Sequence, residues 1–86
     1  MNEPDTFIAT ITDSAHSFEE DMELPSAMPV SELSRQILMI LKEIHADKFE
    51  GWPMCRLECN SVILKKDDTL ITAGVFDGSR IVVREG

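Results

Sequence analysis

The 86-residue chain has room for one small domain, and its 43% apolar residues are typical of a folded protein. Its net charge of −8 disfavours nucleic acid, whose phosphates are neutralised by lysine and arginine. The acidic N-terminus lacks the basic region of an export signal, and no apolar run is long enough to span a membrane. We therefore expect a cytoplasmic protein that neither binds nucleic acid nor inserts into a membrane.

The charge is unevenly distributed along the chain. Residues 1–50 carry eleven acids and three bases, whereas residues 51–86 carry five of each. The acidity can serve solubility alone, or it can form a negative face that meets a basic partner.

The first half of the chain predicts a loose tail, two strands and a helix. Residues 1–5 form the tail, and residues 6–86 are expected to form one domain. Alternating apolar side chains predict strands over 6–12 and 16–24, joined by a polar turn. After a proline-bounded loop the apolar spacing becomes helical, and Ser31 is suited to cap the first turn. The predicted buried stripe of this helix, which ends near residues 46–47, comprises Leu33, Ile37, Ile40, Leu41 and Ile44.

The second half predicts three further strands. A strand over 54–60 alternates again, a short apolar piece follows at 62–64, and the last strand covers 80–84 with Ile81 and Val83 facing the core. Gly74 suits a positive φ, and Asp77-Gly78 is a strong turn signal. The crossover rule predicts that the first and last strands are parallel neighbours. The fold class is thus α+β, with a four- to five-stranded mixed sheet and one main helix on one face.

The sequence offers no recognisable chemistry. Cys55 and Cys59 are about 13 Å apart on a strand, whereas a disulfide needs Cα atoms within about 7 Å. Neither cysteine has a zinc-type spacing to another cysteine or to histidine, so both are expected in the core. No nucleophile, base and acid stand at catalytic spacing, and no phosphate-binding glycine loop is present. We expect no enzyme activity, no cofactor and no metal.

Five short segments resemble a known family. They are Met22–Pro25, Pro29–Leu33, Gly51–Trp52, Thr69–Leu70 and Ala73–Gly78. The element order over residues 6–84 resembles the β-grasp fold of ubiquitin, and the segments resemble the YukD-like family of small bacterial ubiquitin-like proteins linked to type VII (WXG-type) secretion. The resemblance implies a non-catalytic accessory protein that binds other components of the secretion machinery, in the cytoplasm or peripheral to the membrane-embedded complex.

Two alternatives accompany this resemblance. The same segments resemble the ubiquitin-like domain at the cytosolic N-terminus of the multi-spanning membrane component of that system. The chain could also be a modifier or sulfur carrier activated at its C-terminus, as ubiquitin is. Such proteins resemble one another in a flexible Gly-Gly tail, whereas Gly86 here follows Glu85, whose carboxylate would crowd an activating site. Unless a longer precursor exists, we expect no conjugation; oligomeric state is not predicted.

The outward residues of the third and last strands are the main candidates for partner binding. They are Arg56, Glu58, Arg80, Val82 and Arg84. Similarity to ubiquitin aligns Glu58 and Arg84 with two positions of its apolar docking patch, so proteins that read that patch should not bind. The set can be an ordinary soluble sheet face, or a polar partner surface that uses the arginines.

Two further apolar residues are less easily assigned. Met39 lies roughly opposite the predicted helix stripe, so it is either a single exposed side chain or a contact residue. Trp52 precedes Pro53 at the start of the third strand, where it can cover one end of the core or form a binding platform.

Overall fold

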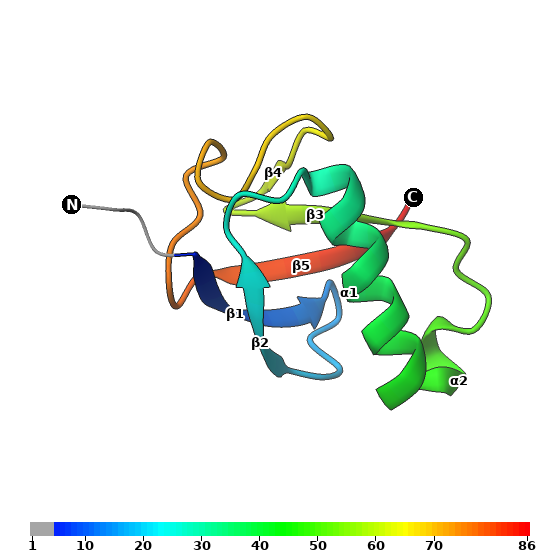
Figure 1. Cartoon of the computed structure of the whole chain (residues 1–86). Helices are drawn as coiled ribbons and strands as arrows, with labels where there is room; N and C mark the ends of the chain where they lie inside the picture. The colour runs from blue at the N-terminus through cyan, green and yellow to red at the C-terminus, as the bar shows by residue number, and fades with distance from the viewer. Residues whose placement is uncertain (1–4) are drawn as a thin grey trace.

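The computed structural model describes residues 5–86, so most of the predicted tail lies outside the described residues. Within these residues the chain forms five strands and two helices (Figure 1). In order these are β1 (Thr6–Asp13), β2 (Glu20–Pro25), α1 (Val30–Ile44), α2 (Ala46–Phe49), β3 (Cys55–Cys59), β4 (Val62–Ile63) and β5 (Arg80–Glu85).

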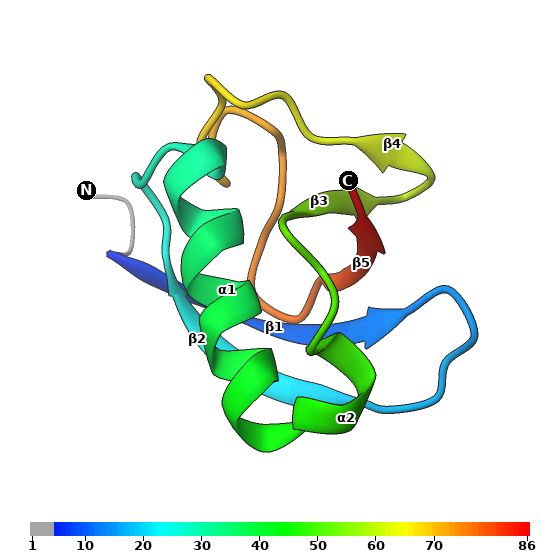
Figure 2. The same ribbon diagram turned by 90° about the vertical axis from the view of Figure 1, so that its right-hand side faces the viewer.

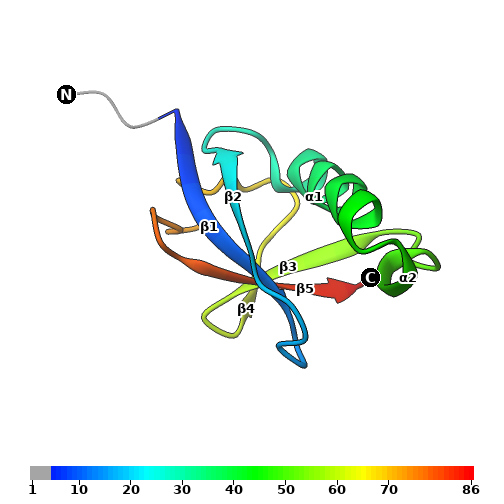
Figure 3. The same cartoon turned by 90° about the horizontal axis from the view of Figure 1, so that it is seen from below.

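The strands form one mixed sheet in the order β2-β1-β5-β3-β4. β1 and β5 are parallel, which confirms the predicted central pair, and the other neighbours are antiparallel. Helix α1 crosses one face of this twisted sheet, and the short α2 turns back beneath its C-terminal end (Figures 2 and 3). The predicted α+β class, with a mixed sheet and one main helix, is confirmed.

The core lies between α1 and the sheet. Ile81 and Val83 are buried as predicted, and Cys55 and Cys59 are free, buried thiols on the same side of β3. Alternation along the strands sends every second side chain to this layer, so the sequence pattern identifies the strand contribution correctly. Burial of this apolar surface is the main stabilising term of the fold.

The hairpin between β1 and β2 differs from its prediction, because β2 begins at Glu20 rather than at residue 16. His16 has a φ of 54°, and Ser17 donates its backbone N–H and its hydroxyl to the Asp13 carboxylate. Although burial acts to raise it, the pKa of Asp13 is lowered by these hydrogen bonds and by Lys48. These side-chain-to-backbone bonds stabilise a loop where alternation alone predicts strand.

The buried face of α1 is rotated from the predicted stripe. Ile40 and Ile44 are 42% and 49% exposed, whereas Val30 and Leu38 are buried beside Leu33, Ile37 and Leu41. The helix contacts both α2 and β3, which covers the Leu38 side and leaves the Ile40 side open. The spacing of apolar residues predicts that one stripe of the helix is buried. It does not predict which side of that stripe is covered by segments that follow later in the chain.

Ser31 is not the N-cap of α1, contrary to the prediction. The cap position is Pro29, without a side-chain hydrogen bond. Instead, the Val30 N–H donates to the Asp68 carbonyl at 2.7 Å, and the Ser31 N–H donates to the Lys66 carbonyl at 3.1 Å. Two of the N–H groups that a helix start leaves unpaired are thus satisfied by a loop far away in sequence.

Trp52 covers one end of the core, which is the first of the two roles that the sequence suggests for it. It is partly buried and packs edge-on against the buried Phe49 ring of α2, with centroids 4.8 Å apart. The α1 helix ends at Ile44, slightly earlier than predicted, because α2 begins a new direction at Ala46.

The segment before β5 contains the predicted turn. Gly74 and Gly78 have φ values of 80° and 85°, the left-handed region that glycine tolerates. The Ile8 N–H donates to the Asp77 carboxylate, and the Gly78 N–H donates to the Ile8 carbonyl, both at 2.7 Å. The turn therefore bonds to β1 before β5 begins, which aligns the central parallel pair.

Candidate functional site

The outer sheet face gathers five of the six candidate binding residues. Arg56 lies directly opposite Arg84, and Glu58 lies opposite Val82, in the β3–β5 register. Their neighbours in each strand are buried under α1, so these side chains are on the face away from the helix. Arg80 continues the row at the start of β5.

The charges on this outer face are largely paired. Arg84 donates from Nε to the Glu58 carboxylate, which raises the pKa of Arg84, and Arg80 binds Glu19 from the β1–β2 loop. Among residues 5–86, Arg56 has no such carboxylate partner. The face thus presents alternating charge rather than a basic cluster.

Met39 is separate from the other candidates. It lies on α1, 65% exposed, on the opposite side of the sheet from the five outward residues. Ile40 and Ile44, which the sequence pattern assigns to the core, are further exposed apolar residues of the same helix. The six candidates therefore do not form one surface.

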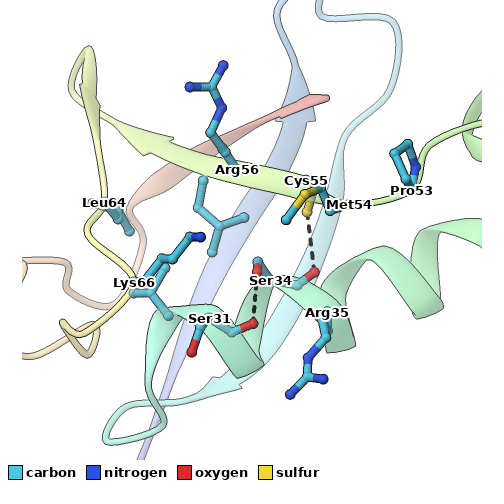
Figure 4. A pocket seen from close by; sticks show the side chains of 11 residues that line it. Ser31, Ser34, Arg35, Pro53, Met54, Cys55, Arg56, Leu64 and Lys66 are labelled. Atoms are coloured by element: carbon cyan, nitrogen blue, oxygen red, sulfur yellow. Dashed lines mark hydrogen bonds between the residues drawn. The ribbon is translucent and has the colours of Figure 1, made fainter. Parts of the chain in front are cut away.

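A groove between α1 and β3 is a feature that sequence reasoning missed. Its volume is about 300 Å³, and Figure 4 shows its lining residues. The Cys55 thiol lies in it and donates to the Ser34 carbonyl of α1 at 3.3 Å. No motif predicts the groove, because its walls come from α1, β3 and the loop after β4. The lining residues are Val30, Ser31, Ser34, Arg35, Pro53, Met54, Cys55, Arg56, Leu57, Leu64 and Lys66.

The two thiols are expected to be unreactive in the folded protein. Burial raises the pKa of Cys55 to about 11 and also raises the pKa of Cys59. At pH 8 a thiol of pKa 11 is about a hundredfold less ionised than one of pKa 9, and the thiolate is the reactive form. A chromogenic disulfide reagent should titrate both thiols in denaturant and react only slowly in buffer. Rapid native reaction of either thiol would contradict this burial.

Within residues 5–86, no three side chains of histidine, cysteine, aspartate or glutamate converge as a metal site. In the same part of the chain, no helix has the length and apolarity needed to cross a membrane. Three surface features of the described residues are candidates for function: the outer face, the flank of α1 that bears Met39, and the groove.

Comparison with known proteins identifies the family. Residues 9–83 match the family described as "WXG100 protein secretion system (Wss), protein YukD". The chain belongs to the YukD family. The predicted relationship to type VII secretion proteins is thereby confirmed at the family level, whereas comparison with curated proteins finds no match.

Solved structures share the fold of this YukD-family chain. The ubiquitin-like domain of the Mycobacterium tuberculosis type VII secretion protein EccD1 is 27% identical, with a TM-score of 0.71 over 91% of this chain and 96% of that one. The EccD5 ubiquitin-like domain from Mycobacterium xenopi is 14% identical, with the same TM-score over 96% and 99%. A chain of the MycP5-free ESX-5 inner membrane complex is 18% identical, with a TM-score of 0.77. That match covers 94% of this chain and 21% of the other.

These matches support two statements about the YukD-family chain. Its fold is ubiquitin-like, and it is a domain of the kind linked to type VII secretion. The ubiquitin of Caldiarchaeum subterraneum has the same fold, with 20% identity and a TM-score of 0.67 over 91% of this chain and 90% of that one. Fold alone therefore does not separate a secretion module from a modifier.

Proposed function

We propose that this protein is a non-catalytic interaction module that binds other components of a type VII secretion system without becoming covalently attached. The observation that carries the proposal is the YukD family match over residues 9–83. The similarity to the ubiquitin-like domain of EccD1, at 27% identity, supports it further. The module works in the cytoplasm, peripheral to the membrane-embedded complex, and its partners are proteins rather than nucleic acid.

The outer face is the first proposed contact surface, since its exposed side chains form an alternating pattern of charge. A partner surface of complementary alternating charge would gain specificity from matching Arg56, Glu58 and Arg84 and from excluding wrong partners. Met39, with its flank of α1, offers a separate apolar contact.

Affinity capture from the native host tests the proposed function. The tagged full chain should retain components of the membrane complex of the type VII system from gently solubilised cells, identified by mass spectrometry. Recovery of unrelated metabolic enzymes alone would refute the secretion assignment. A covalent adduct through Gly86 in the same samples would refute non-covalent action.

Charge reversal at Arg84 tests the outer face. R84E should weaken binding of the captured secretion component about tenfold or more. The substitution places a negative charge where the partner is expected to present a negative group to Arg84. The double variant E58R/R84E restores an internal ion pair in reversed order. Binding that returns in the double variant would mean that the ion pair itself, in either order, supports binding, rather than the charge that Arg84 presents to a partner. Binding unchanged in both variants would exclude the face.

A further inference from the structure

The groove between α1 and β3 has an apolar floor and an open mouth. Val30, Leu57 and Leu64 are buried around it, and the half-exposed Met54 lies at its entrance. Its volume of about 300 Å³ is at the lower end of the range of ligand pockets. A site of this size and polarity suits one or two apolar side chains rather than a large cofactor.

The wall formed by β3 is an incompletely paired sheet edge. β4 pairs only with the end of β3, and among the described residues the last backbone hydrogen bond on that side joins the Leu64 N–H to the Leu57 carbonyl at 2.8 Å. The Met54 carbonyl accepts a bond from the opposite direction, from Gly86. Because backbone groups alternate along a strand, those of Cys55 face the open side, where the described residues provide no strand. An extended peptide can pair there.

Positive charge surrounds the groove in an otherwise acidic protein. Arg35, Arg56 and Lys66 line it, none has a carboxylate partner within residues 5–86, and no carboxylate belongs to the lining. The Lys66 ammonium points between loop and strand, and Arg35 extends outward from the α1 rim (Figure 4). Arg56, an outer-face residue, extends from the β3 rim on the side away from α1, where an alternate side chain of a paired strand can reach it. The acids of β2 are at the far edge of the sheet.

From this combination we propose that the α1–β3 groove binds an extended acidic peptide segment of a partner protein. The peptide pairs with the β3 edge at Cys55, inserts an apolar side chain over Leu57 and Leu64, and places carboxylates near Lys66 and the two arginines. Main-chain pairing supplies affinity, and the alternate side chains supply specificity. Assigning the peptide to a secretion component rests on the proposed function; the groove's chemistry does not.

A direct test uses a fluorescein-labelled nonapeptide with a central leucine, glutamate at alternate positions and serine elsewhere. Binding to the full chain is measured by fluorescence anisotropy, and amide shifts by two-dimensional NMR. We expect saturable binding, with the largest shifts at Cys55, Leu57 and Leu64. The peptide with glutamine in place of glutamate should bind about tenfold more weakly, since charge-assisted hydrogen bonds are lost.

The matched variants are K66E and K65E. The two lysines are adjacent and exposed and lack ion-pair partners among the described residues, but only Lys66 lines the groove. K66E should weaken peptide binding about tenfold to a hundredfold, whereas K65E should change it less than about threefold. The hydrogen bonds of both lysines are accepted by their backbone carbonyls, which the substitutions leave in place, so folding should be retained.

Several results would overturn the groove assignment. They are absence of binding at about 1 mM peptide, shifts confined to the outer face of β3 and β5, equal effects of K66E and K65E, or equal binding of the glutamine peptide. Self-association of the chain that blocks the groove, detected by sedimentation, would instead identify a second copy as the occupant and would also overturn the proposal.

Failure of this inference and failure of the proposed function are distinguishable. Secretion components captured equally by wild type and K66E, without binding of the peptide probe, would reject the groove and leave the function standing. Peptide binding lost in K66E, with no secretion component captured, would support the groove and reject the assignment to secretion.

Discussion

Replacing Phe49 by alanine is expected to lower the free energy of unfolding by about 3–5 kcal/mol. Its side chain is fully buried and packs edge-on against the rings of Phe18 and Trp52, at centroid distances of 5.5 and 4.8 Å. It is also the buried residue by which α2 is attached to the core. A domain of this size has a total stability of about 0.05–0.15 kcal/mol per residue, so the loss is a large share of it.

Urea denaturation followed by far-ultraviolet circular dichroism measures this loss independently of Trp52, whose fluorescence will itself change. The matched control is F76A, because Phe76 is 68% exposed and its removal should alter stability by less than about 0.5 kcal/mol. An F49A variant within about 1 kcal/mol of wild type would mean that the aromatic cluster adds little to the fold.

The strands were predictable because burial follows a simple rule along them. In β5, Ile81 and Val83 are buried while Arg80 and Arg84 are exposed, as the alternation in sequence requires. The turn at Asp77-Gly78 was equally visible, since few residues tolerate its backbone conformation. These local signals were sufficient for the fold class and for the residues of the outer face.

The groove and the exposed flank of α1 were not predictable from local pattern. Ile40 and Leu38 are both good helix-core residues, and the decision between them is made by α2 and β3, which follow later in the chain. The groove likewise requires Leu64 and Lys66 to return to the start of α1, a contact between positions more than thirty residues apart. Such long-range contacts leave no periodicity in the sequence.

Leu70 is also expected to be a sensitive position, with L70A costing about 2–5 kcal/mol. The loop from residue 64 to 79 contains neither helix nor strand, yet Leu70 is fully buried within it. Its carbonyl accepts the Val75 N–H at 2.9 Å, which closes the loop upon itself. Removal of the side chain leaves a cavity, and a shift of the loop to fill it would strain this hydrogen bond.

The effect of L70A should extend to α1 and to the groove. The same loop supplies the Lys66 and Asp68 carbonyls that accept the Ser31 and Val30 N–H groups. Hydrogen exchange at these two amides should therefore accelerate in L70A, beyond the change expected from global stability, because local opening of the loop exposes them. I71A is the matched control, since Ile71 is only partly buried and should cost less than about 1.5 kcal/mol. Equal losses in L70A and I71A, or exchange at Val30 and Ser31 that follows global unfolding alone, would contradict a loop anchored by Leu70. With the predicted pattern, the loop is a separate cooperative unit whose anchoring determines both the start of α1 and the position of Lys66.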